Sequence, residues 1–144
     1  MFKNILLPVP SDGLKKIDIK KIIDAIGFDF RKLTLAFVSD AFPSYIYAEY
    51  ANVTAISETD YRKACNSFAS KLFAKVGSKL PSIDYETCHV YNTNVADGIV
   101  NAAKKSKADL IAMPSHKRAG LAGVFLGSET HRVILSTKIP VLVV

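Results

Sequence analysis

Hydrophobic residues along the chain follow two alternating spacings, one typical of buried strands and the other typical of amphipathic helices. Apolar runs predict five strands, at residues 3–9, 33–38, 84–91, 109–113 and 139–144. The third of these runs alternates polar and apolar residues, which predicts a position at or near a sheet edge. Because helical spacing separates the strands throughout, the pattern predicts an α/β fold with one doubly wound, mainly parallel sheet, right-handed crossovers and helices on both faces.

Four apolar stripes define the predicted helices. Gly27 ends the first helix, Gly77 and Pro81 end the second, and Asn94 is expected to cap the third. The last helix is expected over about residues 128–136. The stripes consist of Ile19, Ile22, Ile23 and Ile26; of Tyr61, Ala64, Cys65, Phe68, Leu72 and Val76; of Ala96, Ile99, Val100 and Ala103; and of Val133 with Ile134.

The length and composition are those of one ordinary globular domain. The chain has 144 residues, so we expect a single α/β domain over residues 1–144. It is 49% hydrophobic and 22% charged, and no apolar run approaches the roughly 18–20 residues of a transmembrane helix. The first residues enter a strand directly and lack the pattern of a signal peptide. These features predict a cytoplasmic protein without a membrane partner.

The net charge of +6 raises the question of nucleic-acid binding. The lysines that cluster do so on the polar face of the first helix and near the end of the third, where cations complement the helix dipole. They are Lys15, Lys16, Lys20, Lys21, Lys104, Lys105 and Lys107. A solvated surface explains them, so nucleic acid is not expected as a partner.

Reactive side chains are few and scattered. Cys65 and Cys88 lack the spacing of a metal or redox motif and are expected to be buried as small hydrophobic residues. The spacing suggests no partner for His89 or His131, and turn chemistry accounts for Asp12. Since no nucleophile, base and orienting group form a catalytic constellation, the sequence predicts neither a catalytic residue nor a metal site, and the protein is not expected to be an enzyme.

Several segments together resemble the universal stress protein family over essentially the whole chain. They are KNILLPV at the start, ADLIAM followed by SHKRAGL, then LGS, and finally IPVLVV. The resemblance implies a five-stranded sheet in the order 3-2-1-4-5 and commonly a homodimer formed through the last strand, Ile139–Val144. An apolar edge strand independently favours such pairing, although packing under a neighbouring helix is the alternative.

The phosphate-binding motif of this family is degenerate here. Nucleotide-binding members carry two glycines and then Gly-Ser or Gly-Thr, at positions that correspond to Pro114, Lys117, Gly127 and Ser128, and an aspartate at the position of Pro10. Only the Gly-Ser pair is kept. Proline has no N–H to donate, and a left-handed conformation at a lysine costs roughly 1–2 kcal/mol. The sequence therefore predicts weak ATP binding or none.

The candidate ligand cleft lies beyond the carboxyl ends of the strands, as in other doubly wound sheets. The resemblance places adenine at Val38 and phosphates along residues 114–128. The amides that follow Gly127 could still hold an anion, although Ser128 could equally be an N-cap. The full candidate set is Pro10, Val38, Met113, Ser115, His116, Lys117, Gly127 and Ser128.

Two functions follow from these observations. The first is a cytoplasmic regulatory or stress-response protein with no cofactor and an unidentified protein partner. The alternative is a nucleotide switch that binds ATP or AMP, with or without magnesium, through an altered phosphate loop; a weak ATPase is less favoured. The aromatic segment 40–57 could instead line a site for another ligand, cover core or form a dimer surface. The sequence does not identify the triggering stress.

Overall fold

Five parallel strands form one sheet. The computed structural model describes residues 1–42, 56–115 and 127–144. The strands are β1 (Asn4–Pro8), β2 (Lys32–Ser39), β3 (Tyr85–Tyr91), β4 (Leu110–Met113) and β5 (Val141–Val143). Their order is β3-β2-β1-β4-β5, and every neighbouring pair is parallel. The predicted strand order is confirmed, and so is the edge position of the third strand.

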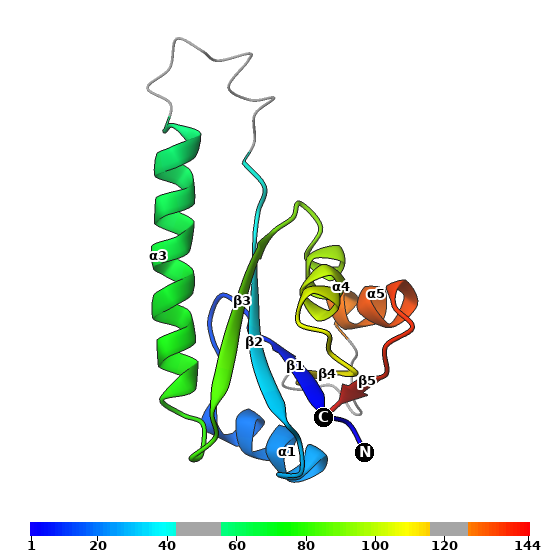
Figure 1. Cartoon of the computed structure of the whole chain (residues 1–144). Coiled ribbons are helices and arrows are strands. Elements are labelled where there is room, and N and C mark those ends of the chain that lie inside the picture. The colour runs from blue at the N-terminus through cyan, green and yellow to red at the C-terminus, as the bar shows by residue number, and fades with distance from the viewer. Residues whose placement is uncertain (43–55, 116–126) are drawn as a thin grey trace, which may run out of the picture.

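Helices cover both faces of this sheet. They are α1 (Lys16–Ile26), α3 (Glu58–Gly77), α4 (Val95–Lys105) and α5 (Ser128–Ser136). Figure 1 shows α1 and α3 on one side of the strands and α4 with α5 on the other. This arrangement confirms the doubly wound α/β fold.

The two layers of helices bury two separate hydrophobic clusters. One face of the sheet contributes Leu7, Leu33 and Leu35, which pack with residues of α1 and α3 such as Ile22 and Val76. The other face contributes side chains that pack with α4 and α5, among them Leu6, Ala36, Ile111, Ile99 and Val133. Helices cover β1 on both faces, and this explains why its sequence is a continuous apolar run instead of an alternating one.

Local sequence signals explain where the helices begin and end. The side chain of Asn94 accepts a hydrogen bond from the Asp97 amide at 3.1 Å, which confirms the predicted cap of α4. Gly27 has a φ of 72°, a conformation that glycine adopts readily, and it ends α1. Ser57, which the sequence analysis missed, caps α3 by accepting from the Asp60 amide at 3.1 Å.

A carboxylate ties the beginnings of β1 and β4 together. The Asp109 side chain accepts hydrogen bonds from the backbone amides of Lys3 and Asn4 at 2.8–3.1 Å. Burial acts to raise the pKa of Asp109, but these amide donors outweigh it and hold the pKa below its ordinary value. This contact fixes the amino end of the sheet, opposite the end where the cleft lies.

The residues that α5 buries differ from those predicted for the last helix. Val133 is buried as predicted, but Ile134 is 40% exposed, and Thr130 is the second buried residue of α5. The helix packs against α4 through one narrow side, so residues 130 and 133 face inward and the next residue turns away. The prediction of a buried Val133–Ile134 pair was therefore wrong.

Burial on α3 is confined to its second half. Ala69, Leu72, Phe73 and Val76 are buried, whereas Phe68 is 47% exposed. The predicted stripe continues through the first half of the helix, but there it faces a cleft instead of packed core.

Neither cysteine is fully buried, in contrast to the prediction. Cys65 and Cys88 are both half-buried free thiols. Cys65 lies on the part of α3 that lines the cleft, and Cys88 lies on edge strand β3, which is covered only in part. Burial raises the pKa of the Cys88 thiol, against the effect of Lys105 and Lys32, so the thiol stays protonated near neutral pH.

Surface features agree with the charge pattern read from the sequence. The lysines of α1 are exposed, and Lys20 pairs with Asp24 at 2.5 Å, one helical turn away. None of the helices in the described ranges combines the length and the apolar character needed to cross a bilayer.

Candidate functional site

The order in which successive strands are added to the sheet reverses after β3, so the switch point of the sheet lies between β1 and β4. From β1 the strands progress outward to β2 and β3, and the chain then returns to place β4 on the other side of β1. Helices on opposite faces leave from the carboxyl ends of these two central strands, which opens a crevice there. This is where the sequence analysis expects the ligand.

A cleft of about 1300 Å³ occupies this position. The ends of β1, β2 and β4 form its floor, α3 and α4 contribute walls, and the start of α5 closes one side. Its lining includes Pro8, Val9, Pro10, Ser11, Phe37, Val38, Ser39, Asp40, Tyr61, Cys65, Phe68, Ile99, Met113, Pro114, Gly127, Ser128, Glu129, Thr130 and His131. The space is large enough for a nucleotide-sized molecule.

Five of the eight predicted site residues meet at this cleft. They are Pro10, Val38, Met113, Gly127 and Ser128. Ser115 follows β4 without contributing to the cleft lining, and its amide donates to the Val144 carbonyl at 2.6 Å. His116 and Lys117, with most of the 114–128 loop, lie outside the described residues, as does most of the aromatic segment 40–57.

Close packing of α4 on β2 fixes the position of Val38. A Cβ atom added to Gly98 would lie 2.5 Å from Cγ1 and 2.7 Å from Cγ2 of Val38. Only glycine allows the two backbones to approach this closely. The placement of Val38 in the cleft therefore depends on a residue that does not line it.

The first turn of α5 borders the cleft with uncapped amides and a carboxylate. Gly127 is the N-cap residue and supplies no side-chain acceptor, and Ser128 is the first helical residue instead of the N-cap that the sequence analysis considered. Glu129 follows in the same turn, where a negative charge complements the helix dipole. Its Oε2 atom is buried and has no hydrogen-bond partner within residues 1–42, 56–115 and 127–144.

A tight turn follows β1 and contributes Pro10 and Ser11 to the cleft lining. The Gly13 amide donates to the Pro10 carbonyl at 2.9 Å, and Gly13 has a φ of 82°. The Val9 amide donates to Ala36 at 2.8 Å, so that donor is already used. Asp12 lies in the turn and is exposed, and it does not contribute to the cleft lining. At the end of β1, therefore, the Val9 amide is engaged within the sheet and Pro10 has no amide hydrogen to offer a ligand.

Aromatic rings form the wall on the α3 side. The rings of Phe37 and Phe68 lie 5.5 Å apart between centroids, and His89 stacks on Phe37 at 5.9 Å. His89 also lies 4.7 Å from the ring of Tyr91. These four rings join β2, β3 and α3 into one surface, of which Phe37 and Phe68 reach the cleft.

His89 has a specific partner, contrary to the expectation from spacing. Its Nε2 atom lies 2.7 Å from Ser39 Oγ, and Ser39 is buried at the end of β2. Burial lowers the pKa of His89 below 6.5, so the imidazole is neutral at physiological pH.

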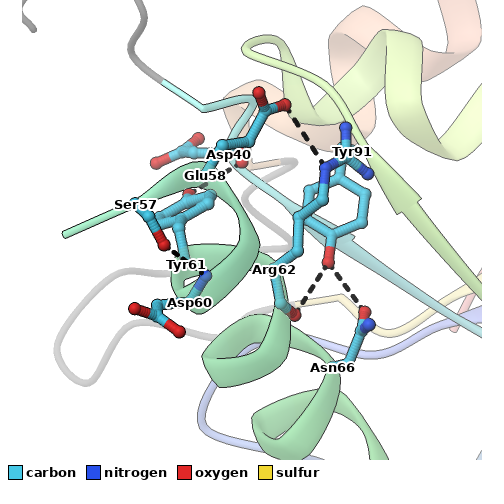
Figure 2. A network of polar contacts seen from close by, with 8 residues as sticks. All are labelled: Asp40, Ser57, Glu58, Asp60, Tyr61, Arg62, Asn66 and Tyr91. Carbon is cyan, nitrogen blue, oxygen red and sulfur yellow. Dashed lines mark hydrogen bonds and ion pairs between the residues drawn. The ribbon is translucent and has the colours of Figure 1, made fainter.

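A polar network attaches the first half of α3 to the ends of β2 and β3 (Figure 2). Tyr61 Oη donates to the Asp40 carbonyl at 2.8 Å, and Tyr91 Oη donates to Asn66 Oδ1 at 2.7 Å. The guanidinium of Arg62 lies 4.6 Å from the centre of the Tyr91 ring, a cation–π contact. This network holds the aromatic wall in place from its outer side.

Both tyrosines of the network remain protonated at any physiological pH. Burial, followed by the effect of the adjacent Cys65, raises the pKa of Tyr61 to about 12. Burial and then Cys65 also raise the pKa of Tyr91, while Arg62 acts in the opposite direction. Each hydroxyl is thus a permanent hydrogen-bond donor.

The comparison with protein families matches residues 1–144 to the Universal stress protein family. The chain belongs to this family. A relative, Universal stress protein MJ0531 of Methanocaldococcus jannaschii, is 49% identical over 49 residues. That match spans 34% of this chain and 29% of the relative, so it covers less than a third of the relative's length.

Solved structures of universal stress proteins and related proteins share the fold. Hypothetical protein MJ0577 aligns over 100% of this chain and 96% of its own, with a TM-score of 0.62 and 24% identity. A universal stress protein in complex with cAMP aligns over 99% and 96%, with a TM-score of 0.53 and 17% identity. A family member from Arabidopsis thaliana with AMP bound aligns over 99% and 90%, with a TM-score of 0.53 and 15% identity.

Proposed function

We propose that this universal stress protein is a regulatory protein that acts through the cleft at the switch point and binds ATP weakly or not at all. The observation that supports this most is the chemistry around the start of α5. Pro10 and Pro114 line the cleft without an N–H to donate, and Glu129 brings a carboxylate to the turn where phosphates would meet helix amides.

The expected loss of affinity is large. Charge-assisted hydrogen bonds contribute about 1.5–3 kcal/mol each, so losing two or three of them weakens binding by several orders of magnitude. Repulsion between the Glu129 carboxylate and a phosphate acts in the same direction. Micromolar affinity for a triphosphate would become negligible.

A nucleotide with one phosphate is the second candidate. Val38, the penultimate residue of β2, lies in the cleft, and the first turn of α5, whose N-cap supplies no side-chain acceptor, borders the same space. Two structurally similar proteins were solved with AMP and with cAMP. AMP would place its base near Val38 and demand fewer phosphate donors than ATP. We assign no catalytic reaction to the cleft.

The proposal includes an assembly and a cellular location. We place the protein in the cytoplasm as a homodimer paired through Ile139–Val144, with a further protein partner that receives the signal. The position of β5 at a sheet edge and the partial exposure of its residues favour this pairing.

Nucleotides carried through purification test the two candidates. The protein is purified from cells without added nucleotide and denatured, and the released small molecules are quantified by mass spectrometry. The proposal expects ATP far below one molecule per chain. AMP near one molecule per chain would establish the second candidate, and ATP at that level would overturn the proposed function.

A further inference from the structure

The cleft wall is largely apolar, and its aromatic part is left partly exposed by the residues that the structure describes. Apolar side chains from β1, β2, α3, α4 and β4 line it, namely Val9, Phe37, Val38, Phe68, Ile99 and Met113. Phe68 remains 47% exposed although its ring packs against Phe37. Such a wall favours a ligand with a flat apolar body, because covering an exposed ring removes apolar surface from water.

The described lining of the cleft carries a charge opposite in sign to that of the whole protein. The whole chain carries a net charge of +6. Among the described residues that line the cleft, by contrast, Asp40 and Glu129 are the acidic side chains, and neither lysine nor arginine is present. An apolar cleft with this balance attracts a cation more readily than a phosphate.

Glu129 contributes the polar group that lacks a partner. Oε2 is buried, and none of the residues that the structure describes donates a hydrogen bond to it. A buried acceptor without a donor costs about 1–3 kcal/mol, and more for a charged group, so such atoms call for a donor from elsewhere. A ligand amine that reached this oxygen would satisfy it with a charge-assisted hydrogen bond.

We propose that the cleft binds a small molecule with an apolar ring system and a protonated amine, with Glu129 accepting a hydrogen bond from the amine and Phe68 covering one face of the ring. This inference rests on the proposed function, since it names the ligand class of the same cleft. It also accounts for the poor fit to a triphosphate, which carries the opposite charge.

Two probes with the same ring and arm and with opposite charge test the proposal. Tryptamine and indole-3-propionate share an indole ring and a two-carbon arm, and they end in an ammonium and a carboxylate respectively. Titration of the full chain is followed by amide chemical shifts of residues around the cleft. We expect tryptamine to bind about tenfold or more tightly than indole-3-propionate, a difference typical of one charge-assisted contact.

A charge-neutralising variant assigns the preference to one residue. Glu129→Gln keeps the shape of the side chain and should bring the two affinities close together. Glu58→Gln is the matched control, because Glu58 is exposed, pairs with Arg62 at 3.4 Å and does not line the cleft. This control should retain the wild-type preference.

The outcomes separate this inference from the function on which it rests. Equal affinity for the two probes, no binding of tryptamine, or an unchanged preference in Glu129→Gln overturns the amine proposal and leaves weak ATP binding standing. Tight binding of ATP with magnesium overturns the proposed function itself, whatever the indole probes do.

Discussion

The Nε2 atom of His89 lies 2.7 Å from the hydroxyl oxygen of Ser39, across the neighbouring strands β3 and β2. The imidazole is also enclosed by the rings of Phe37 and Tyr91. One edge-strand histidine therefore connects the end of the sheet to the aromatic wall of the cleft. Its environment favours the neutral form, which links the stability of this region to pH.

Acidification should destabilise the protein through His89. Burial holds the folded-state pKa below 6.5, so the unfolded chain takes up the proton first as the pH falls through that value. The contribution is fully present above pH 6.5 and is lost progressively down to the folded pKa. Urea unfolding of wild type and His89→Phe across this range measures the effect, and the variant should show a shallower loss.

A second histidine provides the control for this pH effect. His131 lies on an exposed face of α5, so His131→Gln should retain the wild-type pH dependence. An identical slope in wild type and His89→Phe would contradict the assigned role of His89.

Adding a methyl group at Gly98 should be costly. The new Cβ would lie 2.5 Å from Val38 Cγ1, so α4 must shift away from β2. We expect Gly98→Ala to lower the free energy of unfolding by roughly 1–3 kcal/mol, measured by urea denaturation. Gly127→Ala is the matched control, because no atom of the described residues lies within 4 Å of the added Cβ and the φ of Gly127 is −58°.

A double variant identifies the clash. In a Val38→Ala background the methyl added at position 98 has room, so its cost should fall. A cost that is independent of residue 38 would show that the close approach of α4 and β2 is not what requires glycine.

Removal of the Tyr91 hydroxyl should loosen the attachment of α3. Tyr91→Phe loses the 2.7 Å hydrogen bond to Asn66 but keeps the ring under Arg62. The expected loss of stability is about 0.5–1.5 kcal/mol. A double-mutant cycle with Asn66→Ala measures the coupling directly, and fully additive effects would mean that the two side chains do not interact in solution.

Homodimer formation should depend on an outward-facing amide of β5. The Val144 amide donates to Met113 and the Val144 carbonyl accepts from Ser115, so backbone alternation turns the Val143 amide away from β4. Val143→Pro removes this outward donor and keeps the bonds to β4. Light scattering should report a monomer for the variant and a dimer for wild type and for Val143→Ala; a dimer in all three contradicts pairing through this edge.

The fold could be predicted from sequence because local and long-range signals agree. The apolar runs in β1 and β4 are long enough for central strands, and Asn94 caps α4 as its position suggests. The order of strands came from the family resemblance, since hydrophobic periodicity does not specify which strands are neighbours. The misjudged burial of Phe68 and Ile134 has one cause: a helical stripe shows which side is apolar, but not how far the partner surface extends.

The candidate site was predictable only in part. Val38, Met113 and Gly127 lie at or next to the ends of elements that meet at the switch point, so topology brings them together. His89 and Glu129 could not be assigned in this way. Their environments depend on side chains from other elements, and sequence spacing carries no signal for such contacts. Glu129 directly follows Gly127-Ser128 in the sequence, but only the folded structure shows that its Oε2 atom is buried without a partner among the described residues.

Calorimetric titration of the full chain with ATP and magnesium tests the central claim most directly. The account predicts no saturable heat and a dissociation constant weaker than about 1 mM. One ATP bound per chain with micromolar affinity would contradict it, because the prolines and the Glu129 carboxylate around the cleft would then be compatible with a tightly held triphosphate.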